Sequence, residues 1–173
     1  MNLRLEFAVF LALCNTASAA AIEGEKSAEL AFASGHYAEA RAIYRSLEQH
    51  HPDRTDYAIW VGRLSGWLGD YASALSEFQS VLLRNPDNVE ALLGKAYVLL
   101  WQHRYLEAEG LLRRSEALQP ENPEISVAWA KRFSYGGNRV VSARYIRRAL
   151  TLDLLTGTRC DCRENCPNLI RSR

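Results

Sequence analysis

A short pattern returns along this chain every 34 residues. Its clearest copy is Gly69-Asp70-Tyr71-Ala72-Ser73-Ala74, in which a turn residue precedes an aromatic residue and alanine follows three positions later. Related stretches begin at Gly35, His103 and Gly137. This pattern is typical of the turn between the two helices of a repeated helix pair. The spacing therefore predicts an all-α chain without strands.

Counted from this turn, the chain divides into four blocks, 21–54, 55–88, 89–122 and 123–156. Four sites in each block are restricted, because close helix crossings need small residues and proline ends a helix. The eighth site holds Ala28, Gly62, Ala96 and Ala130. The twentieth holds Ala40, Ala74, Ala108 and Ser142. The twenty-fourth, expected to fill the core between repeats, holds Tyr44, Phe78, Leu112 and Ile146. The thirty-second holds Pro52, Pro86, Pro120 and then Leu154.

These sites resemble the tetratricopeptide repeat family over residues 21–153. The resemblance implies a right-handed solenoid of about four helix-turn-helix repeats, or eight helices, following a signal peptide. The first helix of each pair, here called the A helix, would line the concave face. We expect A helices over 23–34, 55–68, 89–102 and 123–135. The second helices, here called B helices, are expected over 37–50, 71–84, 105–118 and 140–152.

Residues 1–19 differ in character from the repeats. Phe7 to Cys14 is an uninterrupted apolar run, and either Ala17-Ser18-Ala19 or Ala19-Ala20-Ala21 offers the small residues that signal peptidase requires. We predict a secretory signal cleaved before Ala20, and hence a periplasmic or secreted protein. The run is much shorter than the roughly 20 residues of a membrane-spanning helix, so no membrane span is expected after cleavage. Lipidation at Cys14 and a retained apolar helix are the alternatives.

Composition and motifs argue against several functions. The formal net charge of +1 and the lack of a basic stripe argue against nucleic-acid binding. No nucleophile elbow, HExxH or phosphate-binding glycine loop occurs. The histidines lie at predicted turns or helix ends. We therefore expect no enzyme, no catalytic residue, no cofactor and no metal site in the repeats.

The residues expected to meet a ligand are those that the resemblance places on the concave face. They combine aromatic rings with two cationic side chains, which suit an extended peptide or the face of a sugar. The predicted ligand groove comprises Phe32, Arg63, Trp67, Tyr97, Trp101, Lys131 and Tyr135. The alternative is that Trp67 and Trp101 pack between successive A helices.

The segment 154–173 is predicted to be an irregular tail, because Leu154 stands where a proline is expected. It contains Cys160, Cys162 and Cys166. Three interpretations stay open: a disordered or accidental tail, a disulfide that staples the chain or links a dimer, and a metal site. Three thiolates are one fewer than a closed zinc site requires, and the tail contains no histidine.

A narrower resemblance lies at the A-helix ends, for example Arg63 to Tyr71 and Tyr97 to Tyr105. It is similar to the periplasmic repeats of YaiO family outer-membrane β-barrel proteins, and more loosely to exopolysaccharide export and synthesis scaffolds. The leading hypothesis is an exported, non-enzymatic scaffold of the bacterial envelope that holds a protein or peptide in its groove. The alternative is the repeat part of a barrel or polysaccharide system, which binds glycan or a barrel partner.

The last repeat lacks an evident capping helix after Leu152. Repeat arrays need a polar terminal cap over their last apolar face. The sequence therefore predicts that the fourth B helix frays, self-associates or docks on a partner.

Overall fold

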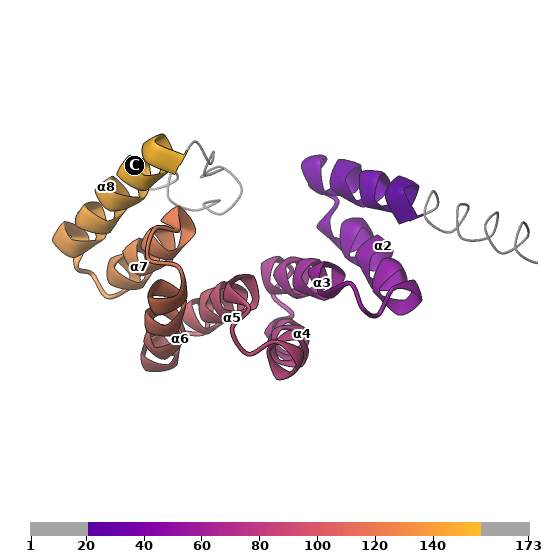
Figure 1. Cartoon of the computed structure of the whole chain (residues 1–173), viewed down its shortest axis with the longest axis horizontal. Coiled ribbons are helices and arrows are strands. Elements are labelled where there is room, and N and C mark those ends of the chain that lie inside the picture. Colours follow the sequence, from indigo (N-terminus) through magenta and orange to yellow (C-terminus); the bar gives the residue numbers. More distant parts are fainter. Residues whose placement is uncertain (1–20, 157–173) are drawn as a thin grey trace, which may run out of the picture. The chain divides into compact units, whose positions relative to one another are not determined.

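The computed structural model describes residues 21–156, and every regular element in that range is an α-helix (Figure 1). The first described helical segment covers residues 21–33. It is followed by α2 (Tyr37–His50), α3 (Thr55–Trp67), α4 (Tyr71–Arg84), α5 (Val89–Trp101), α6 (Tyr105–Leu118), α7 (Pro123–Tyr135) and α8 (Arg139–Thr156). None of the helices in this range has the length and apolar character needed to cross a membrane.

The 34-residue period is visible in the backbone of the turns between A and B helices. Each turn contains one residue in the left-handed region, with φ of 80° at Gly35, 82° at Gly69, 59° at His103 and 77° at Gly137. Glycine adopts this conformation without a steric penalty, whereas a residue with a Cβ atom does not. Among the described residues, His103 is the one non-glycine residue with a positive φ.

Polar side chains cap the starts of several helices, including α4, α5 and α7. The Asp70 carboxylate accepts a hydrogen bond from the Ser73 amide at 3.2 Å, at the start of α4. The Asn88 side chain accepts one from the Ala91 amide at 2.9 Å, at the start of α5. Asn122 caps α7 and is followed by Pro123, whose ring suits the first helical position.

The contacts divide the chain into two compact units, which meet in sequence at Pro86 and Asp87. In unit 1, α3 packs against both α2 and α4. Small side chains allow close helix crossings in this unit, and Ala28, Ala40 and Ala74 are fully buried. The core around the first two A helices consists of Ala28, Ala31, Ala40, Tyr44, Leu47, Tyr57, Val61 and Leu64.

The crossing of α3 and α4 contains a tight glycine contact. A Cβ atom placed on Gly62 would lie 2.9 Å from two ring atoms of Phe78. Phe78 is fully buried, so its ring has no open space into which to move. Gly62 and Phe78 therefore form a matched pair of small and large residues.

In unit 2, α5 packs on α6, α7 packs on both of them, and α8 packs on α7. Ala96 and Ala108 are fully buried at the first crossing. At the α7–α8 crossing, the small residue is Ser142, whose hydroxyl donates a buried hydrogen bond to the Ala130 carbonyl at 2.9 Å. The serine thus replaces alanine without leaving a buried polar group unsatisfied.

The predicted helices agree closely with the structure, and α2, α4, α6 and α7 have the expected bounds. The twenty-fourth site is a core position in three repeats, but that expectation is wrong for Ile146, which is 41% exposed. The helix α8 also runs to Thr156, so residues 154–156 are helical rather than irregular. They contain neither proline nor glycine, and leucine favours helix. The predicted signal peptide and the cysteine cluster, Cys160, Cys162 and Cys166, lie outside the described residues.

Candidate ligand-binding surface

In unit 1, the structure brings the predicted residues Phe32, Arg63 and Trp67 into one aromatic cluster. The rings of Phe32 and Trp67 are stacked, with centroids 5.3 Å apart. The Arg63 guanidinium lies 5.6 Å from the ring centroid of Trp60. Trp60 in turn lies 5.5 Å from Phe32, edge to face. The cluster therefore joins the first two A helices and includes a cation.

This cluster follows from the helical period. Trp60, Arg63 and Trp67 stand at intervals of three and four residues on α3, so they share one face. Tyr37, the first residue of α2, closes the cluster at 5.6 Å from Phe32 and 5.7 Å from Trp67. Trp67 thus has the packing role considered above, and it also keeps a partly exposed edge. We call Phe32, Tyr37, Trp60, Arg63 and Trp67 the unit 1 aromatic surface.

In unit 2, Lys131 lies over two of the predicted rings. Its ammonium nitrogen is 4.9 Å from the ring centroid of Tyr97 and 5.9 Å from that of Trp101. The two rings are stacked, 6.3 Å apart. Lys131 is only 7% exposed, and a cation over aromatic faces at this depth contributes about 1–2 kcal/mol. The cation of α7 therefore fixes the rings of α5.

Tyr135 is the most accessible of the predicted residues in unit 2. It is the last residue of α7, one helical turn after Lys131, and it is 43% exposed. Trp101 is partly exposed, whereas Tyr97 is buried. We call Tyr97, Trp101, Lys131 and Tyr135 the unit 2 aromatic surface. Its accessible parts are the Trp101 ring and Tyr135.

Sequence reasoning missed Trp60 and Tyr37 in unit 1. Trp60 stacks on Tyr44 at 5.3 Å with an interplanar angle of 4°, in addition to its contact with Arg63. Its position seven residues before Trp67 on the same predicted helix was the available signal. Tyr37 belongs to the recurring turn pattern, and so it was interpreted only as a repeat marker.

A second aromatic stack in unit 2 is structural. The rings of Phe133 and Tyr145 lie 5.5 Å apart, and both are within 5.9 Å of Trp129. Trp129 is 5% exposed, and its indole nitrogen is buried without a hydrogen-bond partner in the described range. The stack joins α7 to α8 and offers little surface to a ligand.

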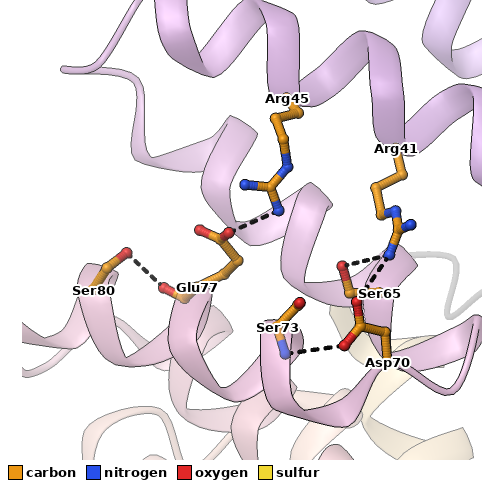
Figure 2. Close-up of polar contacts among 7 residues, drawn as sticks. All are labelled: Arg41, Arg45, Ser65, Asp70, Ser73, Glu77 and Ser80. Carbon is orange, nitrogen blue, oxygen red and sulfur yellow. Dashed lines mark hydrogen bonds and ion pairs between the residues drawn. The ribbon is translucent and has the colours of Figure 1, made fainter.

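The polar contacts in Figure 2 are also structural. Arg41 of α2 donates a hydrogen bond to Asp70 at 3.3 Å, and Arg45 donates one to Glu77 of α4 at 2.9 Å. Hydrogen bonds from Ser73, together with the charge of Arg41, hold the pKa of Asp70 below its usual range. Both ion pairs are partly exposed, so solvent screening keeps their contribution to stability small.

This network consists of arginine, serine and acidic residues. It links the B helices of neighbouring repeats within unit 1. Within residues 21–156, no group of three or more His, Cys, Asp or Glu side chains is arranged to hold a metal ion.

Comparison with known proteins shows which family the repeats resemble. Residues 68–130 match the sequence model of the tetratricopeptide repeat. The chain is 31% identical over 114 residues to TPR repeat-containing protein PA4667 of Pseudomonas aeruginosa, covering 64% of this chain and 19% of that protein. It is 34% identical over 90 residues to uncharacterized protein y4yS of Sinorhizobium fredii, covering 52% of this chain and 49% of that protein. The chain thus spans a fifth to a half of these relatives.

Solved structures share the fold. TTC0263, a TPR protein of Thermus thermophilus, superposes with a TM-score of 0.69 at 17% identity, covering 77% of this chain and 74% of that one. MamA of Desulfovibrio magneticus RS-1 gives a TM-score of 0.61 at 21% identity, with coverage of 78% and 76%. The narrower resemblance to YaiO family repeats finds no support in these comparisons. Residues 68–130 are therefore similar in sequence to tetratricopeptide repeats, and residues 21–156 share the fold of solved tetratricopeptide repeat proteins.

Proposed function

We propose that this chain is a non-enzymatic scaffold that holds a segment of a partner protein on the aromatic surfaces of its A helices. Tetratricopeptide repeat proteins in general bind protein or peptide partners. The observation that carries the proposal is the same in both units. Each unit places a cation against aromatic rings of its A helices, at Arg63 with Trp60 and at Lys131 with Tyr97 and Trp101.

The chemistry of the two surfaces indicates the kind of segment that suits them. Exposed ring edges of Trp67, Trp101 and Tyr135 favour apolar or aromatic side chains. Arg63 is partly exposed and carries a charge that attracts a carboxylate. An extended segment with apolar residues and at least one acidic residue would satisfy both features.

This proposal is tested with peptides selected from a random-peptide library on the purified chain. Arg63→Glu is expected to weaken binding of an acidic selected peptide at least tenfold, since it replaces attraction by repulsion. Tyr135→Ala is expected to lower the affinity for peptides that bind unit 2 by about threefold to tenfold. Fluorescence anisotropy measures the dissociation constants.

The matched control is Leu106→Ala. Leu106 is 83% exposed on α6, a B helix, and belongs to neither aromatic surface. Its substitution should leave binding unchanged, and thermal unfolding should show that all three variants fold. Equal binding by wild type and Arg63→Glu, or selection of no peptide, would count against the scaffold proposal.

The alternative ligand is a glycan, which the partly exposed rings of Trp67 and Trp101 would bind by stacking on sugar faces. It corresponds to a role in an outer-membrane barrel or exopolysaccharide system. Saturable binding of an oligosaccharide, lost in Trp67→Ala and Trp101→Ala at unchanged thermal stability, would favour this alternative. Loss of the fold in the same variants would instead show that the two rings act mainly in packing.

We also propose that the protein is exported to the bacterial envelope. The support is the apolar run from Phe7 to Cys14 followed by Ala17-Ser18-Ala19. Expression of the full chain in a bacterial host should yield a periplasmic protein whose intact mass corresponds to a chain that begins at Ala20 or Ile22. A cytoplasmic product that retains Met1 would contradict export, and a lipid-modified Cys14 would indicate an anchored form.

A further inference from the structure

The outward face of α8 is apolar and exposed. Ile146, Leu150 and Leu154 are 41%, 51% and 86% exposed. They are spaced by four residues, so they form a stripe along one side of the helix. The adjoining side of α8 is packed, with Ser142 and Ala149 buried at 7% and 5% exposure. We call Ile146, Leu150 and Leu154 the α8 stripe.

The repeat register shows what such a stripe normally contacts. Ile146 is equivalent to Tyr44, Phe78 and Leu112, which are 3%, 0% and 0% exposed. Tyr44 is covered by the A helix of the following repeat, since it stacks on Trp60 of α3 at 5.3 Å and lies 6.3 Å from Tyr57. The α8 stripe therefore occupies the position on which a further A helix would pack.

The direction of the stripe agrees with this register. Arg148 donates a hydrogen bond to Glu116 of α6 at 2.6 Å and another to the Pro120 carbonyl at 3.1 Å, so its side of α8 faces the preceding repeat. Ile146 and Leu150 are each two residues from Arg148, which places them about 200° away around the helix. The stripe thus points away from the rest of unit 2.

Charge decides which kind of helix would fit. The exposed residues Arg139, Arg144 and Arg147 have no ion-pair or hydrogen-bond partner of their side chains among the described residues. On the helical wheel, Arg147 lies beside the stripe, and Arg139 lies on the same side of α8 as the stripe, near the N-terminus of the helix. The single acidic residue of α8 is Asp153. A binding helix must therefore supply carboxylates beside its apolar residues.

We propose that the α8 stripe binds an amphipathic helix of a partner protein, with acidic residues flanking its apolar face, in the place of a following A helix. The α8 stripe of a second copy of this chain fits less well, because it would bring the same three unpaired arginines against a positively charged surface. The first helix of a second copy fits less well too. Its sites equivalent to Tyr57, Trp60 and Val61 of α3 hold Glu23, Lys26 and Ser27, which are polar.

The chain's own tail is also disfavoured by charge. Residues 157–173 contain four arginines against Asp161 and Glu164. A segment with this composition adds positive charge to a surface that is already positive. The tail is therefore a less suitable occupant than an acidic helix of another protein. The residues of the α8 stripe belong to neither aromatic surface.

The test uses two labelled synthetic peptides with the apolar spacing of α3. One carries glutamates at the flanking positions, and the matched control peptide carries lysines there. The full chain should bind the glutamate peptide at least tenfold more tightly than the lysine peptide. Leu150→Glu and Arg147→Glu should each lower the affinity for the glutamate peptide at least tenfold. Arg147→Glu should also raise the affinity for the lysine peptide.

Leu106→Glu on α6 is the matched control variant and should leave the affinity of both peptides unchanged, since Leu106 is 83% exposed on another helix. No binding, or equal affinity for the two peptides, would overturn the proposal. A dimer in sedimentation velocity that Leu150→Glu dissociates would overturn it in favour of a second copy. Leu169 is an apolar residue of the tail 157–173. Tenfold tighter peptide binding in Leu169→Glu would show that the tail competes for the stripe, and would overturn the proposal in favour of the tail. Arg63→Glu distinguishes this proposal from the proposed scaffold site. It should leave the affinity for the glutamate peptide unchanged, because Arg63 does not belong to the α8 stripe.

Discussion

Leu112→Ala is expected to lower the free energy of unfolding by about 2–5 kcal/mol, because it leaves a cavity in a packed core. Leu112 is fully buried on α6, which packs against α5 and α7. Ile146→Ala, at the equivalent site of the next repeat, should cost only about 1–1.5 kcal/mol, since Ile146 already keeps much of its surface in water. Ile146 is 41% exposed. The same position of the repeat thus contributes much more to the free energy of unfolding in the third repeat than in the fourth.

Urea unfolding followed by circular dichroism measures both variants, with the slope of the transition as a check on compactness. Leu106→Ala is the surface control, because Leu106 is 83% exposed on the same helix as Leu112. Equal losses for Leu112→Ala and Ile146→Ala would mean that Ile146 is covered in solution, contrary to the exposed α8 stripe.

Gly62→Val should destabilise unit 1 by about 1–3 kcal/mol through overpacking. A Cβ atom on Gly62 would lie 2.9 Å from the Phe78 ring, well inside ordinary contact distance. The gain in helix propensity from replacing glycine is at most about 1 kcal/mol and does not offset this clash. Phe78 is fully buried and cannot swing away.

The control for this prediction is Gly110→Val in α6. A Cβ atom there meets no heavy atom within 4 Å, so the change should stay within about 0.5 kcal/mol. The double variant Gly62→Val with Phe78→Leu should recover part of the stability that Gly62→Val loses, because the smaller side chain makes room. An unchanged or increased free energy of unfolding in Gly62→Val would show that the α3–α4 crossing is looser than the structure indicates.

The sequence predicted the fold well because its strongest signals act locally. Asp70, Asn88 and Asn122 each cap a helix, and Pro52, Pro86 and Pro120 recur where the B helices have ended. These residues act on the backbone within one or two turns, so their effect does not depend on the rest of the fold. The helix bounds could therefore be predicted almost to the residue.

The end of α8 was predicted less well. The missing proline at Leu154 was interpreted as loss of helix, whereas the helix continues to Thr156. Absence of a stop signal allows a helix to continue, and leucine favours continuation. The exposure of Ile146 depends on whether another A helix packs on the fourth repeat, whereas residue type alone predicted a core position.

The sequence predicted most residues of the aromatic surfaces, but not how their side chains contact one another. The A-helix sites identified Arg63, Trp67 and Lys131, yet the contact of Arg63 with Trp60 and the burial of Lys131 over two rings depend on side-chain directions in neighbouring helices. Those directions depend on packing between repeats, about which the spacing within one helix carries no information. This is why Trp60 was missed.

The most direct measurement of the central claim is the amide and indole NMR spectrum of the chain during titration with a library-selected peptide. The chain has four tryptophans, so four indole signals report on separate places in the array. Signals are assigned with Trp67→Phe and Trp101→Phe. The scaffold account predicts that the indole signal of Trp67, Trp101 or both shifts in a saturable way, while that of the buried Trp129 stays unchanged. Saturation by the peptide with neither Trp67 nor Trp101 affected would contradict the assignment of the A-helix aromatic surfaces as the binding site.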